Sequence, residues 1–210
     1  MILRRSFYNR PTLDVARDLI GKVLVHETRG GMASGVIVEV EAYIGESDPA
    51  CHAAPGPTAR NAPLYGPPGI AYVYLNYGIH YLVNAVTEAE GWPAAVLIRA
   101  LEPKDGIPLM RRRRALRRSS GQAAGGTKRP SDLAVHDLCR GPGNLTKALG
   151  ISLGDNLLDL TRSALRIEDQ KEPKRPVGWS RRVGLTVGVE REWRVTATGS
   201  PALSGLRRRL

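Results

Sequence analysis

Apolar residues recur at a helical spacing near the start of the chain. Leu13, Ala16, Leu19 and Ile20 fall on one stripe, and Thr12 stands at the position of an N-cap. Gly21 follows the stripe, and glycine commonly ends a helix. We therefore predict a first helix from Thr12 to Ile20, capped by Thr12.

A strand-like pattern replaces the helical one directly afterwards. Residues 22–28 (KVLVHET) and 34–43 (SGVIVEVEAY) are rich in β-branched residues, and a Gly-Gly pair at 30–31 separates them. This arrangement predicts an antiparallel hairpin. Since side chains alternate along a strand, Glu39 and Glu41 are expected on one face.

The segment at 45–69 is rich in Gly, Pro and Ala, which predicts a long loop. A loop of that length inside a compact domain is usually functional or disordered. The sequence at 70–86 then favours two strands with a turn at Asn76–Gly78, and 94–103 (AAVLIRALEP) predicts a further buried strand.

The composition changes in the second half of the chain. Six arginines lie between 109 and 118, and a Gly/Ser-rich stretch follows, so we expect a flexible basic insert at about 109–131. Asn144–Leu149 is expected to form a short helix. Further strands are expected at 155–167, 181–188 and 193–201.

Strands scattered along the chain with few long helices between them indicate an α+β fold around a largely antiparallel sheet. The length of 210 residues suits one domain, which we place at 1–210. Hydrophobic residues make up 42% and charged residues 24%, as in ordinary globular proteins.

The formal net charge of +11 favours a polyanionic partner, either nucleic acid or an acidic membrane face. No apolar run resembles a secretory signal or a membrane span, and the basic residues do not form a membrane-surface helix. We therefore expect nucleic acid and a cytoplasmic location, with nucleoid association if the source is bacterial. Cys51 and Cys139 fit a reducing compartment and are too few for a thiolate zinc site.

Two side chains around the long loop are candidates for chemistry. Glu41 ends an apolar strand just before the loop, where a carboxylate can activate water. The alternative is a solvated face or half of an ion pair. His52 lies within the loop and can stack on a base or donate a hydrogen bond to one, although a local hydrogen bond is the simpler interpretation.

Tyrosines concentrate in the predicted hairpin that follows. Tyr72 and Tyr74 share a strand face, which is typical of half-buried packing, but Tyr77 falls in the turn and has no core to pack against. In a basic protein such a residue is a plausible wedge between base pairs. Asn84 and Arg99, on the next strands, can supply polar floor groups; sheet-edge hydrogen bonding and a surface ion pair are their alternatives.

The order of these motifs resembles the alkyladenine (3-methyladenine) DNA glycosylase family. The resemblance runs from about Leu13 to the C-terminus, and the ordered set is specific although no single piece is. The matching segments are Glu39-Val40-Glu41-Ala42-Tyr43, His52, Arg60-Asn61, Pro68 to Gly78 (PGIAYVYLNYG), Asn84, Leu97-Ile98-Arg99-Ala100-Leu101-Glu102-Pro103, Gly141-Pro142, Arg182-Val183-Gly184 and Gly199-Ser200-Pro201.

This resemblance implies a single mixed domain around a curved antiparallel sheet, with peripheral helices and a protruding β-hairpin. It implies a base-excision-repair enzyme that flips an alkylated or deaminated purine out of double-stranded DNA. Hydrolysis of the N-glycosidic bond then leaves an abasic site. We expect a monomer without metal or organic cofactor.

By the same resemblance, two residues carry the chemistry. Glu41 would be the general base for the attacking water, and Arg99 would lie beside it to hold the water and phosphate arrangement. No lysine stands at a motif position where a Schiff base would form, so we expect a monofunctional glycosylase.

The remaining roles concern binding. Tyr43 and His52 would flank the flipped base, with Tyr74 on its opposite face. Asn84 would contact the purine edge and obstruct the amino group of guanine, and Tyr77 would intercalate through the minor groove. Phosphate contacts are expected from Arg111–Arg114, Arg117, Arg118 and Arg207–Arg209.

Departures from the family pattern put the substrate range in doubt more than the reaction. Asn76 stands beside the wedge where an apolar residue is usual, and Ile79, Leu64 and the Pro67-Pro68 pair are further departures or variable positions. The main alternative is a non-catalytic module that binds damaged or bent DNA with the same wedge. An RNA-binding, ribosome-associated protein is a third possibility, supported only by charge.

Overall fold

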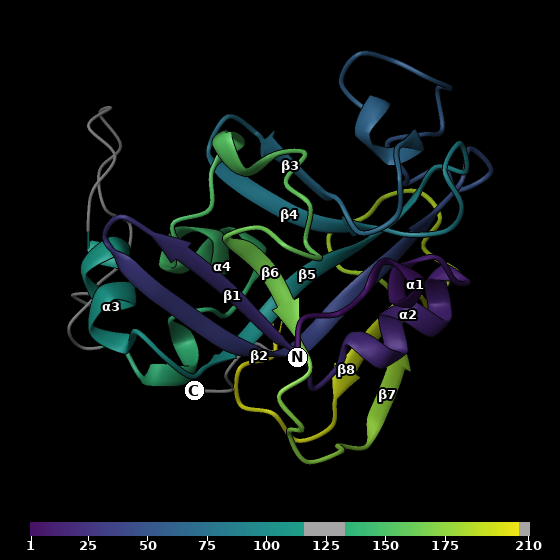
Figure 1. Cartoon of the computed structure of the whole chain (residues 1–210). Coiled ribbons are helices and arrows are strands. Elements are labelled where there is room, and N and C mark those ends of the chain that lie inside the picture. The colour runs from purple at the N-terminus through teal and green to yellow at the C-terminus, as the bar shows by residue number, and fades with distance from the viewer. Residues whose placement is uncertain (116–132, 206–210) are drawn as a thin grey trace.

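An eight-stranded antiparallel sheet runs through the molecule in the order β3-β4-β5-β2-β1-β6, with β8 pairing with both β2 and β7 (Figure 1). The computed structural model describes residues 1–115 and 133–205. The strands are β1 (Val23–Thr28), β2 (Gly31–Ile44), β3 (Ala71–Asn76), β4 (His80–Val86), β5 (Ala94–Pro103), β6 (Leu165–Glu168), β7 (Val177–Ser180) and β8 (Arg194–Ala197).

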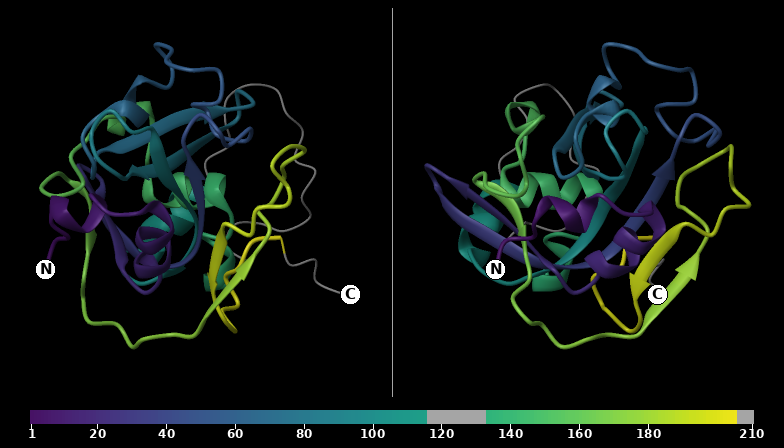
Figure 2. Two further views of the ribbon diagram at one scale, coloured as in Figure 1. Left: turned by 90° about the vertical axis from the view of Figure 1, so that its right-hand side faces the viewer. Right: turned by 45° about the vertical axis from the view of Figure 1, so that its right-hand side comes forward.

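Short helices pack against this sheet, and the sheet curls around some of them (Figures 1 and 2). Helix α2 packs on β2 and β5, α4 packs on β4 and β5, and α3 packs on α4. The expected mixed fold with a curved antiparallel sheet is therefore confirmed. The helices are α1 (Arg5–Tyr8), α2 (Thr12–Leu19), α3 (Ile107–Ala115) and α4 (Pro142–Leu149), with the 3₁₀ turns η1 (Ala62–Tyr65), η3 (Val135–Asp137) and η4 (Leu153–Asp155).

The first predicted helix is present, but its expected cap is wrong. Pro11 occupies the N-cap position, and Thr12 is already helical. The Thr12 hydroxyl lies 2.7 Å from Glu88 Oε1, which also accepts from the Thr12 backbone N–H over 2.6 Å. A carboxylate distant in sequence therefore satisfies the helix N-terminus, as its partial positive charge favours.

The predicted strand at 181–188 is also wrong. Strand β7 ends before it, and the segment forms a loop that rises beside the end of β2 (Figure 2). Gly184 and Gly188 have positive φ angles of 79° and 59°, which interrupt an extended chain. The Arg182 side chain is buried on Asp48 instead of alternating along a strand. The other expected strands are shorter than predicted, reduced to β6 and β8.

The predicted basic insert begins inside a helix. Residues 109–115 belong to α3, where Met110 is fully buried. Arg113 Nη1 donates to the carbonyl oxygen of Leu149 over 2.7 Å, at the end of α4. Core packing therefore orders the start of the insert, while 116–131 lies outside the described residues, as do Arg117, Arg118 and Arg207–Arg209.

The two faces of the sheet have different compositions because side chains alternate along each strand. One face is apolar and packs with helices α2 and α4 in the main core. The other carries aromatic and polar groups. The core face includes Val40, Ala42, Val73, Val83, Ala85, Val96 and Ile98, whereas the opposite face includes Tyr43, Tyr72, Tyr74, Asn84, Leu97 and Arg99.

An irregularity in β2 decides which face receives the acidic residues. Ile37 and Val40 both pack in the core although three positions separate them, and the register against β5 shifts on both sides of Glu39. An extra residue in one strand inverts the alternation beyond it. The bulge therefore turns Glu39 and Glu41 away from the core face on which a regular strand would place them.

Candidate active site

A cavity of about 300 Å³ opens on the aromatic and polar face of the sheet. The β3–β4 hairpin, β5 and the two long loops at 45–69 and 181–188 contribute its walls. Residues that line it are Tyr43, Ala50, Cys51, His52, Leu64, Tyr72, Tyr74, Asn76, Tyr77, Leu82, Asn84, Ala95, Leu97, Arg99, Pro142, Val183, Gly184 and Leu185. The site residues predicted from the sequence line this cavity, with the exception of Glu41.

The carboxylate of Glu41 lies directly behind the cavity wall and has no exposed surface. Its Oε2 accepts from the Tyr43 hydroxyl over 2.9 Å and from Arg99 Nη1 over 3.0 Å. Its Oε1 accepts from the backbone N–H of Val183 over 2.7 Å. Each of these donors belongs to a residue of the cavity wall. Because the carboxylate has no exposed surface, a water molecule in the cavity reaches it only if one of these wall groups moves.

A second carboxylate holds Arg99 from behind. Glu39 Oε1 accepts from Arg99 Nε over 2.9 Å and from Arg194 Nε over 2.9 Å. The Ser204 hydroxyl, 2.7 Å from the same oxygen, adds a contact from near the C-terminus. Burial opposes ionisation, but Arg99, Ser204 and Arg194 together lower the pKa of Glu39. The predicted shared face of Glu39 and Glu41 is confirmed, because both contact Arg99.

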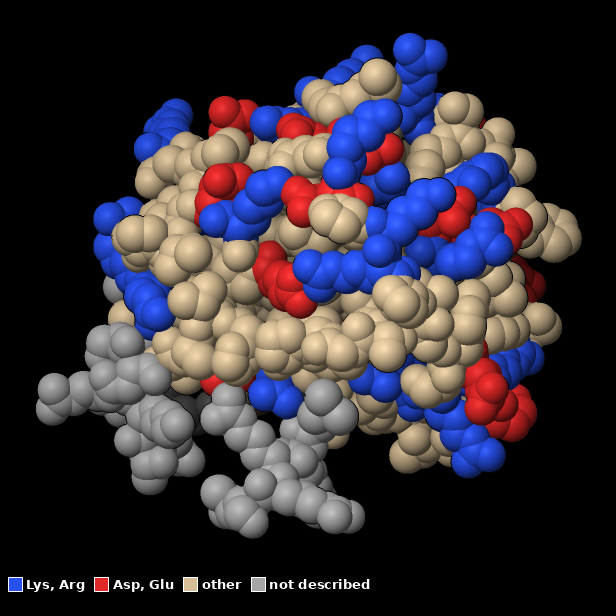
Figure 3. Space-filling model, turned by 90° about the horizontal axis from the view of Figure 1, so that it is seen from below, with Lys and Arg blue, Asp and Glu red and all other residues tan. Residues whose placement is uncertain are grey.

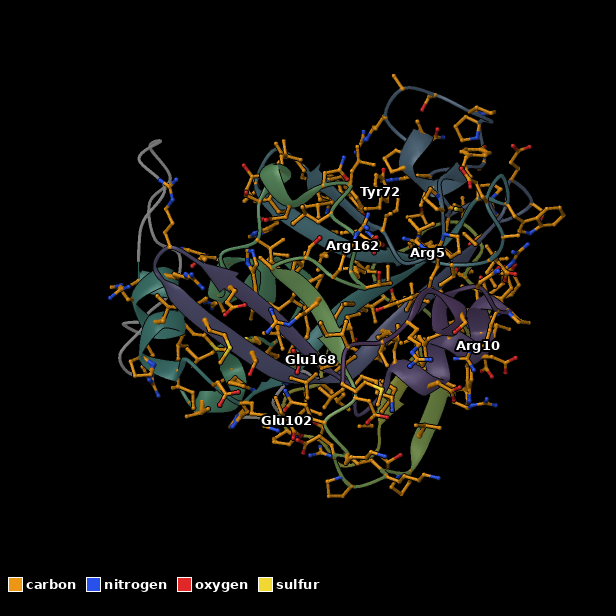
Figure 4. The ribbon with its side chains drawn as sticks, in the orientation of Figure 1. Arg5, Arg10, Tyr72, Glu102, Arg162 and Glu168 are labelled. Atoms are coloured by element: carbon orange, nitrogen blue, oxygen red, sulfur yellow. The ribbon has the colours of Figure 1, made fainter. Side chains whose placement is uncertain are left out.

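His52, Tyr72 and Tyr74 form one aromatic cluster beside the cavity, with Tyr72 on strand β3 (Figure 4). The Tyr72 hydroxyl lies 2.8 Å from His52 Nδ1. The His52 and Tyr74 ring centroids are 4.5 Å apart at 62°. These two rings touch, so a planar base enters between them only if one of them moves. Burial, with a smaller contribution from Arg60, lowers the pKa of His52.

The loop that carries His52 is organised by an asparagine. Asn61 Nδ2 donates to the carbonyl oxygens of His52 and Gly56 over 2.7 and 2.9 Å, and Asn61 Oδ1 accepts from the Thr58 N–H. Asn61 is itself buried. The Arg-Asn pair in the sequence therefore includes a structural residue, which fixes the loop with His52 against the cavity.

Asn84 lies on β4, lines the cavity and is 4% exposed. Its Nδ2 donates to the Tyr72 carbonyl oxygen over 3.0 Å, which orients the side-chain amide. The sequence alone left open whether this residue contributes to a polar floor or only to hydrogen bonding at a sheet edge. In the structure Asn84 lines the cavity and makes one hydrogen bond, to the Tyr72 carbonyl oxygen of the paired strand.

Tyr77 stands at the tip of the β3–β4 hairpin and is 88% exposed. Its φ of 47° and the φ of 66° at Gly78 place both turn residues in the left-handed region, as in a type I′ turn. A bulky side chain rarely adopts this conformation. The ring lines the rim of the cavity and projects from the molecule, so it lies where the turn prediction placed it.

Sequence reasoning assigned no role to the loop at 181–188, which lines the cavity through Val183, Gly184 and Leu185. Val183 supplies a backbone donor to Glu41, and Arg182 lies over the Tyr43 ring at 4.6 Å from its centroid. The Arg-Val-Gly motif was the sequence signal that this loop belongs to the site. The motif did not indicate contacts with Glu41, because those contacts join segments that are far apart in the sequence.

Charges of both signs alternate on the face seen in Figure 3. Among the described residues, oppositely charged side chains form ion pairs such as Lys22–Asp169, 2.9 Å apart, and Arg166–Glu27, 2.8 Å apart. Within residues 1–115 and 133–205, no cluster of His, Cys, Asp or Glu side chains is arranged to hold a metal ion. None of the helices in these ranges has the length and apolarity needed to cross a bilayer.

Comparisons with known proteins agree on one family. The family model described as methylpurine-DNA glycosylase matches residues 6–201. A Bradyrhizobium diazoefficiens protein named "Putative 3-methyladenine DNA glycosylase" is 46% identical over 96% of this chain and 90% of its own. Proteins with the same name from Rubrobacter xylanophilus and Methanocella arvoryzae are 49% and 44% identical, over 87% and 97% of this chain and 86% and 96% of their own.

Proposed function

Since the chain belongs to the methylpurine-DNA glycosylase family, it is a DNA glycosylase of base-excision repair. We propose that it flips a damaged purine out of the duplex and hydrolyses the bond between that base and deoxyribose. Chemistry on a base inside a duplex requires such extrusion, which costs a few kcal/mol. Alkylated and deaminated purines that pair or stack poorly lower this cost.

The observation that carries the proposal is the position of Glu41. This buried carboxylate lies one hydrogen bond behind the wall of a cavity lined by tyrosines, and its three donors all come from that wall. Replacing one of these contacts with water would place a nucleophile between the carboxylate and an everted sugar. Glu41 would then orient and deprotonate this water, as a general base that contributes typically 10²–10⁴-fold.

Alkylated purines suit an active site that has a general base but no strong general acid. A 3-methyl or 7-methyl purine carries positive charge and is a good leaving group, so the protein needs little acid catalysis for it. The negative charge of Glu41 stabilises the oxocarbenium-like sugar that develops as the bond breaks, as carboxylates do in glycoside hydrolysis. Arg99 holds that carboxylate in place through its 3.0 Å contact.

Aromatic side chains supply the binding surface for the flipped base. Tyr43, His52 and Tyr74 would stack on it, and a cationic purine gains about 0.5–2 kcal/mol from such rings. His52 and Tyr74 touch in the free protein, so binding would separate them. Asn84 would contact the purine edge from the floor, and Tyr77 would fill the space that the base leaves.

The test uses duplexes that each contain one lesion: 7-methylguanine, 3-methyladenine, hypoxanthine or ethenoadenine. Each is incubated with excess protein, and heating in alkali then cleaves the strand at any abasic site. We expect base release from at least one alkylpurine duplex. We also expect strand cleavage only after the heating step, because a monofunctional enzyme leaves the strand intact.

Replacing Glu41 by Gln separates catalysis from binding. In E41Q we expect base release to fall by about 10²–10⁴-fold while lesion binding survives, because the amide keeps the shape but is not a base. Glu27→Gln on the neighbouring strand β1 is the matched control, since that side chain is 57% exposed and remote from the cavity. Unimpaired purine release by E41Q would contradict the assignment of Glu41 as the general base. Lesion binding without purine release by the unmodified protein would favour a non-catalytic module.

A further inference from the structure

A buried ion pair lies behind the cavity and has no part in the chemistry described above. Arg182 donates to both carboxylate oxygens of Asp48, over 2.6 and 2.8 Å, and neither side chain has exposed surface. Despite its burial, this pairing raises the pKa of Arg182. Desolvating two charges is costly, so a buried ion pair is weak evidence for a stabilising role. The contacts of Arg182 indicate what else the pair does.

Arg182 connects two sides of the site. Its Nη1 also donates over 3.0 Å to the carbonyl oxygen of Ala42, the residue between Glu41 and Tyr43. Its guanidinium group lies 4.6 Å from the centroid of the Tyr43 ring, and Arg182 itself does not line the cavity. The adjacent residue, Val183, donates its N–H to Glu41. One side chain and the next peptide group therefore fix both the strand and the loop that meet at Glu41.

We propose that Arg182, held by Asp48, is a positioning residue for base release. It holds the Val183 N–H on Glu41 and supports the Tyr43 ring from behind, on the side away from the flipped purine. This inference rests on the proposed function, because it assigns Arg182 a role through Glu41 and Tyr43. Misplacing a catalytic group by about 1 Å is enough to lower a rate about 10²-fold.

The chain offers a matched control at the same aromatic ring. Arg191 lies 4.5 Å from the centroid of Trp193, the ring that Arg182 approaches to 5.2 Å. Its Nη1 is 3.8 Å from Asp48. The Arg191 hydrogen bond goes to the carbonyl oxygen of Ser47, away from Glu41. Arg191 therefore shares the Trp193 ring and the acidic partner of Arg182 without its contacts at the site.

The experiment compares Arg182→Lys, Asp48→Asn and Arg191→Lys with the unmodified protein. For each we would measure the single-turnover rate of base release from a 7-methylguanine duplex at saturating protein, the Kd for that duplex and the Tm. Rates are normalised to the fraction of protein that binds the duplex. We expect R182K and D48N to lower the normalised rate about 10- to 100-fold with a much smaller change in Kd, and R191K to keep the unmodified rate.

Several outcomes would overturn this role. The first is that R182K or D48N folds and keeps the normalised rate of the unmodified protein. If only the Tm of such a variant falls, the ion pair is purely structural. The second is an equal loss of rate in R191K. If R182K fails to fold, D48N decides, because its amide keeps the size of the side chain but removes the charge and one of the two oxygens that accept from Arg182. Absence of base release by the unmodified protein would overturn the proposed function instead.

Discussion

The two acidic side chains of β2 have different surroundings although they share a face and an arginine. Glu39 accepts from Arg99, from Arg194 and from both the hydroxyl and the backbone N–H of Ser204, so its four acceptor positions are filled. Glu41 accepts from groups of the cavity wall. Only Glu41 can therefore exchange a donor for a water molecule from the cavity, whereas Glu39 serves to hold Arg99.

A prediction at this scale concerns the charge of His52. Burial, with a smaller contribution from Arg60, lowers the pKa of His52 from its ordinary value, so the ring is mainly neutral at pH 7 and gains its proton as the pH falls. Acidification from pH 7 toward 5 would then place a positive ring against the base. We expect affinity for a cationic 7-methylguanine duplex to fall about tenfold or more relative to a neutral hypoxanthine duplex, since like charges at about 4 Å repel by about 4 kcal/mol in partly buried surroundings.

The measurement is the ratio of the two Kd values across this pH range. His52→Gln, which cannot acquire the charge, should give a ratio that does not change with pH. The sign follows from linkage: a histidine with a lowered pKa in the folded protein takes up its proton unfavourably there, so stability also falls as the pH drops below the unfolded value. A pH-independent ratio in the unmodified protein would rule out this role of the ring.

At the scale of elements, the β3–β4 hairpin separates a rigid base from an exposed tip. Ladder pairs run from Ala71 with Ala85 to Asn76 with His80, and α4 packs against β4. The tip residue Tyr77 has a left-handed backbone and almost no packing. Strain of this kind at an exposed position points to function, because folding gains nothing from it.

Tyr77→Ala should therefore weaken DNA binding without weakening the fold. Stacking of an aromatic ring on a base is worth about 1–3 kcal/mol, so we expect at least about a fivefold rise in the Kd for lesion DNA. The free energy of unfolding should change by less than about 0.5 kcal/mol, as for other exposed positions. Leu157→Ala is the control, because Leu157 is also exposed and left-handed but lies outside the cavity. Unchanged affinity in Y77A would show that the ring is no wedge.

The bulge in β2 is the element that makes the site possible. It turns Glu39 and Glu41 out of the core face and brings Val40 and Ala42 into it. Pairing with β5 on one edge and β8 on the other then holds the backbone of Glu41 on both sides. Rigid pairing around a re-aimed side chain is a recurrent arrangement at the active sites of β proteins.

For the molecule as a whole, the net charge of +11 sets the long-range interaction with DNA. Segments 116–132 and 206–210 carry more than half of this excess in their sequence. Within residues 1–115 and 133–205, many lysines and arginines are instead paired with acids. The segments outside the described residues are therefore strong candidates for contacts with phosphates.

This distribution predicts a salt-sensitive, sequence-independent component of binding. Log K should fall linearly with log salt, with a slope of about −0.9 for each phosphate contact. Replacing Arg207, Arg208 and Arg209 by Gln should make the slope shallower by about one for each arginine that contacts a phosphate. The measurement is the affinity for undamaged duplex between low and moderate salt. An unchanged slope in the triple variant would exclude the C-terminal arginines as contacts.

Features that depend on neighbours along the chain could be predicted from the order of residues alone. Alternation places Glu39 and Glu41 on one face and Tyr72 and Tyr74 together on another strand, and the Asn-Tyr-Gly turn places Tyr77 at a hairpin tip. These features follow from periodicity and turn chemistry, which act over a few residues. The motif order likewise indicates the family, because it consists only of residue types and the spacings between them.

The surroundings of Glu41, by contrast, depend on how distant segments pack together. Its donors come from β2 itself, from β5 and from the loop after β7, and Arg182 reaches Asp48 across 134 positions. The cap of α2 is likewise a carboxylate distant in the sequence, on Glu88. Contacts of this kind are chosen by burial: a buried polar group must find a partner, and packing rather than chain order determines which one is near.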